Sequence, residues 1–174
     1  MKKSLAIVWV ALGVPCLALA APPATLHVQQ SITIKAPLDK VWAAAKDFDG
    51  LAKWHPALDK DEIVKGTNNA PGAVRALSLK GGGMIKEELV AFSDQTHAFT
   101  YKILESPLPV SGYSSTFKVK PGKDGTTVIN WSGTFKRKNA DENPPADQTD
   151  EAAKKVITGI YSSGLANLKK QVES

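Results

Sequence analysis

The last long segment of the chain, residues 148–172, has the hydrophobic pattern of one amphipathic helix. At 1.5 Å per residue it would be roughly 37 Å long, so it needs an extended surface to pack against. Asp147 is placed to cap its first turn, and lysines near its end suit the negative end of the helix dipole. Apolar or small side chains recur every three or four positions: Ala153, Val156, Ile157, Ile160, Tyr161, Gly164, Leu165, Leu168 and Val172.

Two glycines, Gly159 and Gly164, lie inside this helix. Each should cost about 1 kcal/mol relative to alanine in a helix interior. Their presence predicts places where another element packs closely against the helix, or where a cavity lies beneath it.

Most of the chain before this helix has the period-two alternation of β-strands. Short connections rich in Gly, Pro and Asn join these strands, so we expect hairpins and an antiparallel sheet. Two short helices are predicted at 38–48 and 50–53, and residues 139–146 read as a loop. The predicted strands are residues 27–35, 59–65, 73–80, 84–92, 97–105, 113–120 and 126–138.

This order of elements predicts an α+β helix-grip fold. A seven-stranded curved antiparallel sheet would wrap around the long C-terminal helix, with the two short helices following the first strand. The alternation supports one buried face and one solvated face. In the predicted strand 113–120, for example, Tyr113, Ser115 and Phe117 share the face opposite Lys118.

Residues 1–20 have the pattern of a cleavable signal peptide, in which positive charges precede an apolar run and residues 18–20 form a small-x-small cleavage site. The alternatives are a membrane anchor, for which the run is short, and a lipoprotein at Cys16, which the preceding proline disfavours. Cleavage would leave a single domain, 21–174, of 174 − 20 = 154 residues, with a net charge of 20 − 17 = +3 and no cysteine. We therefore expect a periplasmic protein that has no membrane attachment after cleavage.

Three strings and the order of elements resemble the START-related (SRPBCC, Bet v 1-like) superfamily, including its polyketide cyclase/dehydrase branch. The strings are SITIKAPLDKVWAAAKDFDGLAKWHP (31–56), EELVAFSD (87–94) and NWSGTF (130–135). Two further strings are similar to the MxaD family of periplasmic methanol-oxidation accessory proteins: LPVSGYSSTFKVKP (108–121) and NPPADQTDEAAKKVITGIYSSGLANLKK (143–170). The resemblance covers nearly all of the chain after the signal peptide.

The resemblance implies a cavity between the sheet and the long helix. Its MxaD branch implies a role beside methanol dehydrogenase and the cytochrome c that accepts its electrons, as a helper rather than as the oxidising enzyme. The sequence contains no Cys-x-x-Cys-His haem attachment motif and no glycine-rich nucleotide loop after a strand. We therefore expect no cofactor.

A glutamate at an inward-facing strand position is the clearest candidate for a ligand contact. The superfamily comparison directs the Glu of the E-x-L string, Glu87, toward the cavity, on the same face as Leu89. A buried acid is costly unless it is hydrogen-bonded or neutralised, and a ligand's polar group would explain its presence. The structural alternatives are that Glu88 faces inward instead, or that Glu87 pairs with a lysine at the cavity mouth.

The motif Trp54-His55-Pro56 lies where the second short helix meets the sheet. His55 could gate a cavity or donate a hydrogen bond to a ligand, or the motif could pack the corner of the fold. The three histidines are scattered and have no carboxylate at ligand spacing, so no metal site is predicted. The candidate cavity residues, of which Tyr113, Ser115 and Trp131 come from the superfamily comparison, are Trp54, His55, Glu87, Tyr101, Tyr113, Ser115, Trp131, Tyr161 and Gly164.

Three functions fit these observations. The first, implied by the resemblance, is an accessory protein that docks methanol dehydrogenase or its cytochrome through a mildly basic surface. The second is a carrier or sensor of a small apolar ligand. The third is a cyclase/dehydrase-type enzyme, with Glu87 as general acid or base and Tyr113 polarising a carbonyl. No nucleophile–base pair is visible, so no catalytic residue is assigned, and the scattered lysines argue against nucleic-acid binding.

Overall fold

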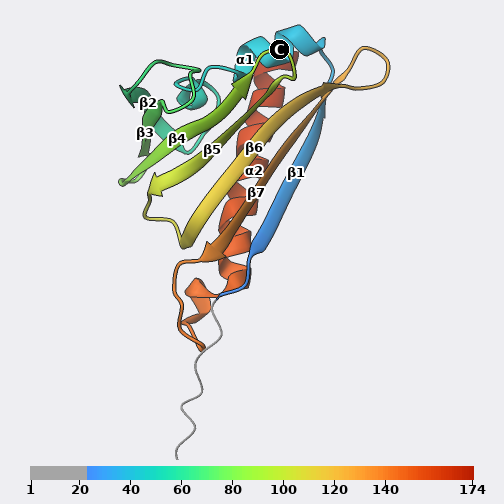
Figure 1. Ribbon diagram of the computed structural model, residues 1–174. Coiled ribbons are helices and arrows are strands. Elements are labelled where there is room, and N and C mark those ends of the chain that lie inside the picture. The colour runs from blue at the N-terminus through green and yellow to red at the C-terminus, as the bar shows by residue number, and fades with distance from the viewer. Residues whose placement is uncertain (1–22) are drawn as a thin grey trace, which may run out of the picture.

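One antiparallel sheet packs against one long helix, α2 (Asp150–Glu173), in the computed structural model, which describes residues 23–174 (Figure 1). The predicted signal peptide therefore lies outside the described residues. The strands are β1 (Leu26–Ile34), β2 (Leu58–Lys65), β3 (Val74–Leu79), β4 (Met84–Ser93), β5 (Ala98–Glu105), β6 (Val110–Pro121) and β7 (Thr127–Arg137).

The seven strands lie in the order β1-β7-β6-β5-β4-β3-β2. The six strands after the short helices follow one another as hairpin neighbours, because each connection is a short turn. β1 then pairs with β7, so the first and last strands of the chain are adjacent in the sheet. The structure confirms the predicted α+β helix-grip architecture.

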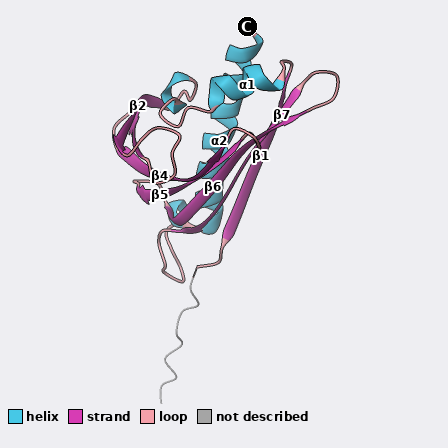
Figure 2. Ribbon diagram, turned by 45° about the horizontal axis from the view of Figure 1, so that its top comes forward, coloured by secondary structure: helices cyan, strands magenta, loops and turns pink. Residues whose placement is uncertain are grey.

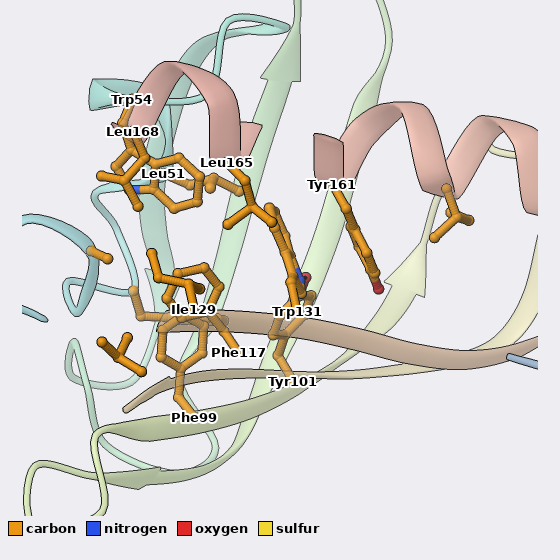
Figure 3. Close-up of a cluster of buried hydrophobic side chains, with 14 of the residues drawn as sticks. Leu51, Trp54, Phe99, Tyr101, Phe117, Ile129, Trp131, Tyr161, Leu165 and Leu168 are labelled. Carbon is orange, nitrogen blue, oxygen red and sulfur yellow. The ribbon is translucent and has the colours of Figure 1, made fainter. Parts of the chain in front are cut away.

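The inner face of the sheet is set by side-chain alternation, as predicted. In β6, the buried positions are Val110 at the start of the strand and then, in strict alternation, Tyr113, Ser115, Phe117 and Val119. Facing positions in β5 and β7 bury Phe99 and Tyr101, and Trp131 and Phe135. Figure 3 shows that Phe117 and Trp131 lie on the side of the sheet from which α2 projects Tyr161, Leu165 and Leu168. The hydrophobic core therefore lies between the sheet and α2.

The two short helices, α1 (Leu38–Ala45) and the 3₁₀ helix η1 (Leu51–Lys53), cover one end of the sheet. The predicted helix 38–48 is too long by three residues at its end. The reason is a loop contact: the backbone N–H of Phe48 donates to the Asn69 side chain, and that of Asp49 to Asn68. Figure 2 shows α1 beside the C-terminal end of α2.

The helix α2 starts after Thr149, whose Oγ1 accepts a hydrogen bond from the N–H of Ala152 at 3.1 Å. The prediction that Asp147 caps this helix is wrong, because Asp147 belongs to a separate 3₁₀ turn, η2 (Ala146–Gln148). The predicted apolar face is buried except at its edge, where Val156 is exposed and Ile160 is half-buried. Among residues 23–174, no helix is long and apolar enough to cross a bilayer.

The two glycines of α2 have different surroundings. A Cβ on Gly164 would lie 2.5 Å from His55 Cδ2 and 3.2 Å from Trp131 Cζ3, whereas a Cβ on Gly159 would meet nothing within 4 Å. Gly164 thus allows the helix to pack closely against the corner of the fold. The expectation that these glycines mark a cavity is not met at either position, because Gly159 faces outward.

Alanine at the two glycines should have opposite effects on stability. Gly159→Ala should stabilise the protein by up to about 1 kcal/mol through helix propensity. Gly164→Ala should destabilise it by about 1–3 kcal/mol, because the added methyl group overlaps the His55 ring. Urea unfolding of both variants measures the difference, and each variant controls for the other because both make the same substitution in one helix. Equal effects would contradict this account of the packing.

Candidate functional site

A small cavity lies between α2 and the inner face of the sheet. Its volume is about 50 Å³, enough for a few water-sized molecules. The half-buried side chains of Leu79, Leu108 and Ile160 form part of its rim. The lining is mostly apolar or aromatic: Leu51, His55, Ala57, Leu58, Leu77, Leu79, Ile85, Glu87, Tyr101, Ile103, Leu108, Tyr113, Trp131, Ile157 and Ile160.

Glu87 is the single carboxylate in this lining, and it is 5% exposed. Its Oε2 accepts a hydrogen bond from Arg75 Nε at 2.8 Å and forms an ion pair with Arg75 Nη2 at 2.6 Å. The pairing follows from the β3–β4 hairpin, in which Arg75 lies directly opposite Glu87. Both structural alternatives are therefore wrong: Glu88 pairs with Lys102 on the other face, and the partner of Glu87 is a buried arginine rather than a lysine.

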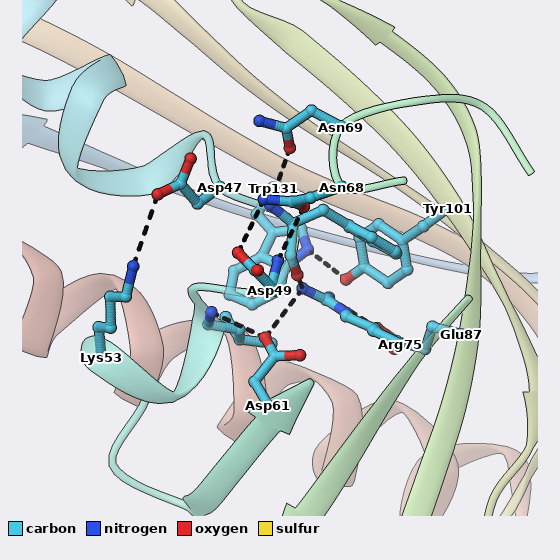
Figure 4. Close-up of polar contacts among 12 residues, drawn as sticks. Asp47, Asp49, Lys53, Asp61, Asn68, Asn69, Arg75, Glu87, Tyr101 and Trp131 are labelled. Carbon is cyan, nitrogen blue, oxygen red and sulfur yellow. Dashed lines mark hydrogen bonds and ion pairs between the residues drawn. The ribbon is translucent and has the colours of Figure 1, made fainter. Parts of the chain in front are cut away.

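The Arg75 guanidinium is 2% exposed and has further partners (Figure 4). Its Nη1 donates to the carbonyl of Phe48 at 2.6 Å and lies 3.6 Å from the Asp61 carboxylate. The guanidinium carbon lies 4.1 Å from the centre of the Phe48 ring and 5.2 Å from that of Tyr101, within the range of cation–π attraction. One cation therefore joins two carboxylates, a carbonyl and two rings.

The two carboxylates of this cluster differ in their environments. Burial raises the pKa of Asp61 to about 6, against the attraction of Arg75 and the hydrogen bond from the Leu51 N–H. Its Oδ1 is buried without a hydrogen-bond partner. Burial also raises the pKa of Glu87, and Arg75 opposes that rise. Because a guanidinium keeps its protons, Arg75 supplies a permanent positive charge beside Glu87, which favours the ionised form of this carboxyl group.

A chain of hydroxyl groups forms the wall next to Glu87. Ser115 Oγ donates to the carbonyl of Ser132 at 2.8 Å, so it has no second proton to give. It therefore accepts from Tyr161 OH, at 2.9 Å, and from Trp131 Nε1, at 3.1 Å. Tyr161 projects from α2 and stacks on Trp131 with ring centres 4.4 Å apart (Figure 3).

The bond from Ser115 to the Ser132 carbonyl fixes which hydroxyl group donates and which accepts in each of the other bonds. Since Tyr161 gives its proton to Ser115, the 2.5 Å contact with Tyr113 is a bond that Tyr113 donates. Tyr101 accepts from Trp131 Nε1 at 3.0 Å and lies 3.5 Å from Tyr113 OH. Burial raises the pKa of Tyr101 to about 12 and raises those of Tyr113 and Tyr161 as well. All three hydroxyls remain protonated, and only that of Tyr101 lacks a short acceptor among the described residues.

His55 has both ring nitrogens engaged. Its Nε2 lies 3.0 Å from the carbonyl of Ile160, to which it donates, and its Nδ1 accepts from the N–H of Ala57 at 3.2 Å. Burial lowers the pKa of His55, which favours this neutral form. The ring connects the end of η1 to α2 and packs the corner of the fold. Among residues 23–174, no group of His, Cys, Asp and Glu side chains is arranged to hold a metal ion.

The structure places the nine sequence candidates in three groups. His55, Glu87, Tyr101, Tyr113 and Trp131 line the cavity. Ser115 and Tyr161 lie behind that lining and position its hydroxyl groups, whereas Trp54 and Gly164 belong to the packing of the corner.

Arg75 and Asp61 were missed by the sequence reasoning. A signal existed for Arg75: it is one of only two arginines, and it stands in an apolar strand. A hairpin turning at the glycines 81–83 places it opposite Glu87. No comparable signal marks Asp61, because the contact that buries it comes from the N–H of Leu51 in η1.

Replacing Arg75 alone should destabilise the protein more than replacing Arg75 and Glu87 together. Arg75→Met leaves Glu87 buried and uncompensated and should cost about 3–5 kcal/mol, part of which the double variant Arg75→Met/Glu87→Leu should recover. Urea unfolding in a double-mutant cycle gives the coupling energy. The control cycle is Lys102→Met with Glu88→Leu, a more exposed pair at 3.0 Å, whose coupling should stay below about 1 kcal/mol. Equal couplings would contradict a special role for the buried pair.

Asp61 should make the protein less stable as the pH rises. Its folded-state pKa of about 6 lies above the ordinary value of 3.8, so the folded protein holds the proton more tightly than the unfolded chain does. The protonated Asp61 contributes at most about 3 kcal/mol to the free energy of unfolding. This contribution is fully present below about pH 4 and is lost as the pH rises through about 6. Asp61→Asn should abolish this part of the pH dependence. Asp59→Asn, at an exposed position of β2, should leave it in place; if both variants behave alike, the pKa of Asp61 is not raised.

Comparison with known proteins agrees with this fold. A family model described as "Polyketide cyclase / dehydrase and lipid transport" matches residues 25–173. MLP-like protein 423 of Arabidopsis thaliana is 29% identical over 141 residues, which cover 74% of this chain and 86% of that protein. The abscisic acid receptor PYL10 of the same plant is 32% identical over 103 residues, 55% of this chain and 56% of the receptor.

Solved structures show the same architecture. The protein XoxI from Bacillus cereus superposes with a TM-score of 0.74 at 33% identity, over 84% of this chain and 94% of that one. The Zhui aromatase/cyclase from Streptomyces sp. R1128 has a TM-score of 0.72 at 20% identity, over 86% and 94% of the two chains, which shows the fold alone. Since the family model spans nearly all of the described residues, the chain belongs to the polyketide cyclase/dehydrase and lipid transport family of the SRPBCC, Bet v 1-like superfamily.

Proposed function

We propose that this protein binds a small, largely apolar molecule in the cavity beneath α2. The observation that carries the proposal is the lining, in which apolar and aromatic side chains surround a single carboxylate and two tyrosine hydroxyls. An apolar pocket with a few convergent polar groups is typical of small-molecule sites. The family description, which includes lipid transport, supports the same function, as does the name of PYL10, a receptor for abscisic acid.

We propose binding rather than catalysis because the two groups that would transfer protons, Tyr113 and Glu87, are already engaged by other side chains. The enzyme hypothesis needs Tyr113 to donate to a substrate carbonyl, but that proton is given to Tyr161. Glu87, the acid or base in that hypothesis, is held by a hydrogen bond and an ion pair with Arg75. Both groups are therefore arranged to stay in one protonation state, which suits recognition better than proton transfer.

A role in periplasmic methanol oxidation is a second proposal. It is supported by the two MxaD-like strings and by the signal peptide predicted at residues 1–20, whereas the comparisons favour ligand binding. Its test is affinity capture from periplasm of a methylotrophic bacterium at low and high salt. Methanol dehydrogenase or its cytochrome should be retained at low salt and lost at high salt; if neither is retained at low salt, this role is wrong.

Filling the rim of the cavity should abolish ligand binding without unfolding the protein. The rim position Leu79 is half-buried, so Leu79→Trp should place an indole in the cavity at a modest cost in stability. Binding of cyclopentane and similar small apolar compounds can be followed by the ¹³C-methyl NMR shifts of Leu77, Ile85 and Ile157. The control, Val90→Trp, changes an exposed position of β4 that does not line the cavity. If cavity methyls do not shift in the wild type, or shift equally in Leu79→Trp, the proposed function is wrong.

A further inference from the structure

The hydrogen-bond donors around the cavity are almost all engaged by the protein itself. Arg75 directs Nε and Nη2 to Glu87 and Nη1 to the carbonyl of Phe48, and it does not line the cavity. The N–H groups of His55 and Trp131 are given to the Ile160 carbonyl and to the Tyr101 and Ser115 oxygens. No lysine or arginine belongs to the described lining.

One acceptor in the lining is not engaged. The hydrogen bond from Arg75 Nε and the ion pair with Arg75 Nη2 both involve Oε2 of Glu87, and no hydrogen bond from the described residues goes to Oε1. Oε1 is also not among the fully buried atoms that lack a partner, and Glu87 lines the cavity. The oxygen that remains therefore faces the space that a ligand would occupy.

We infer that the ligand of this cavity carries a hydrogen-bond donor, a hydroxyl or an ammonium group, and that carboxylic acids of the same size are excluded; this inference rests on the proposed function. A donor would complete the hydrogen bonding of Glu87 Oε1. A ligand carboxylate would instead meet the Glu87 carboxylate in an apolar space that offers no free cation, so it would be repelled as well as desolvated.

The hydroxyl group of Tyr101 should distinguish an alcohol ligand from an ammonium ligand. Its hydroxyl has no acceptor closer than the 3.5 Å contact with Tyr113, and it lines the cavity. An alcohol oxygen can accept from Tyr101 while its proton is given to Glu87. An ammonium group can only donate, so its binding depends on Glu87 and not on the Tyr101 hydroxyl.

The test uses four probes of equal size: isobutanol, isobutylamine, propionate and cyclopentane, each with five heavy atoms. They are titrated at pH 7.5 into the full folded chain, and binding is read from the ¹³C-methyl shifts of Leu77, Ile85 and Ile157. The alcohol and the amine should each bind at least tenfold more tightly than propionate. Propionate binding as tightly as either would overturn the inference.

Cyclopentane distinguishes this inference from the proposed function. If all four probes bind with equal affinity, the cavity takes apolar molecules but does not select a donor, so the inference fails and the proposed function stands. If none of the four shifts the cavity methyls, both fail. Shifts that also occur in Leu79→Trp come from outside the cavity and count as no binding.

Two variants test the named atoms. In Glu87→Gln the amide oxygen replaces Oε2 as the acceptor of Arg75, so the amide N–H₂ faces the cavity. The amine should then bind at least tenfold more weakly and propionate more tightly, with cyclopentane unchanged. Tyr101→Phe should weaken isobutanol about 2- to 10-fold and leave isobutylamine unchanged. If Glu87→Gln does not fold, the affinities of the wild type and of Tyr101→Phe still test the inference. If Tyr101→Phe weakens the binding of isobutanol and of isobutylamine equally, the role of the Tyr101 hydroxyl is refuted.

Discussion

The guanidinium of Arg75 joins the loop between α1 and η1, which no backbone ladder connects to β3, to side chains on the two strands that flank β3. It binds Glu87 on β4, the Phe48 carbonyl in the loop between α1 and η1, and the neighbourhood of Asp61 on β2. A buried ion pair is favourable only when its remaining donors are satisfied, and here the carbonyl and the Phe48 ring provide the additional partners. The loop must therefore lie against the inner face of the sheet, and that position brings η1 and His55 toward α2.

The position of α2 follows from two contacts with opposite requirements. At Gly164 the helix must come close, because the His55 ring and Trp131 occupy the space where a side chain would be. At Tyr161 a large side chain reaches the sheet and is fixed by Tyr113 and Ser115. Beyond these contacts Ile157 and Ile160 face the cavity. The cavity thus exists beside the closest contact of the helix, not beneath its glycines.

Much of the fold could be predicted because it depends on local patterns. Alternation identifies the inner faces of the strands, and Glu87 of the E-x-L string is buried on the inner face as predicted. The partner of Glu87 could not be identified from alternation, because an arginine in an apolar strand becomes meaningful only with the hairpin register that places Arg75 opposite it. The cap of α2 was also predicted wrongly because it depends on a neighbouring element. Residues 146–148 form their own 3₁₀ turn, so the helix begins later and Thr149, not Asp147, caps it.

The two polar parts of the cavity wall differ in a way that bears on function. The hydroxyl chain ends on the Ser132 carbonyl, and each proton from Tyr113 onward has an acceptor within the protein. Buried polar groups in native proteins are nearly always satisfied in this manner, so the chain is explained by stability alone. Glu87 is not explained in the same way, because Arg75 engages only one of its oxygens. A residue needed only to neutralise Arg75 could use both oxygens in the usual bidentate geometry. The one-sided pairing leaves an acceptor at the cavity surface, which is the arrangement that recognition of a donor requires.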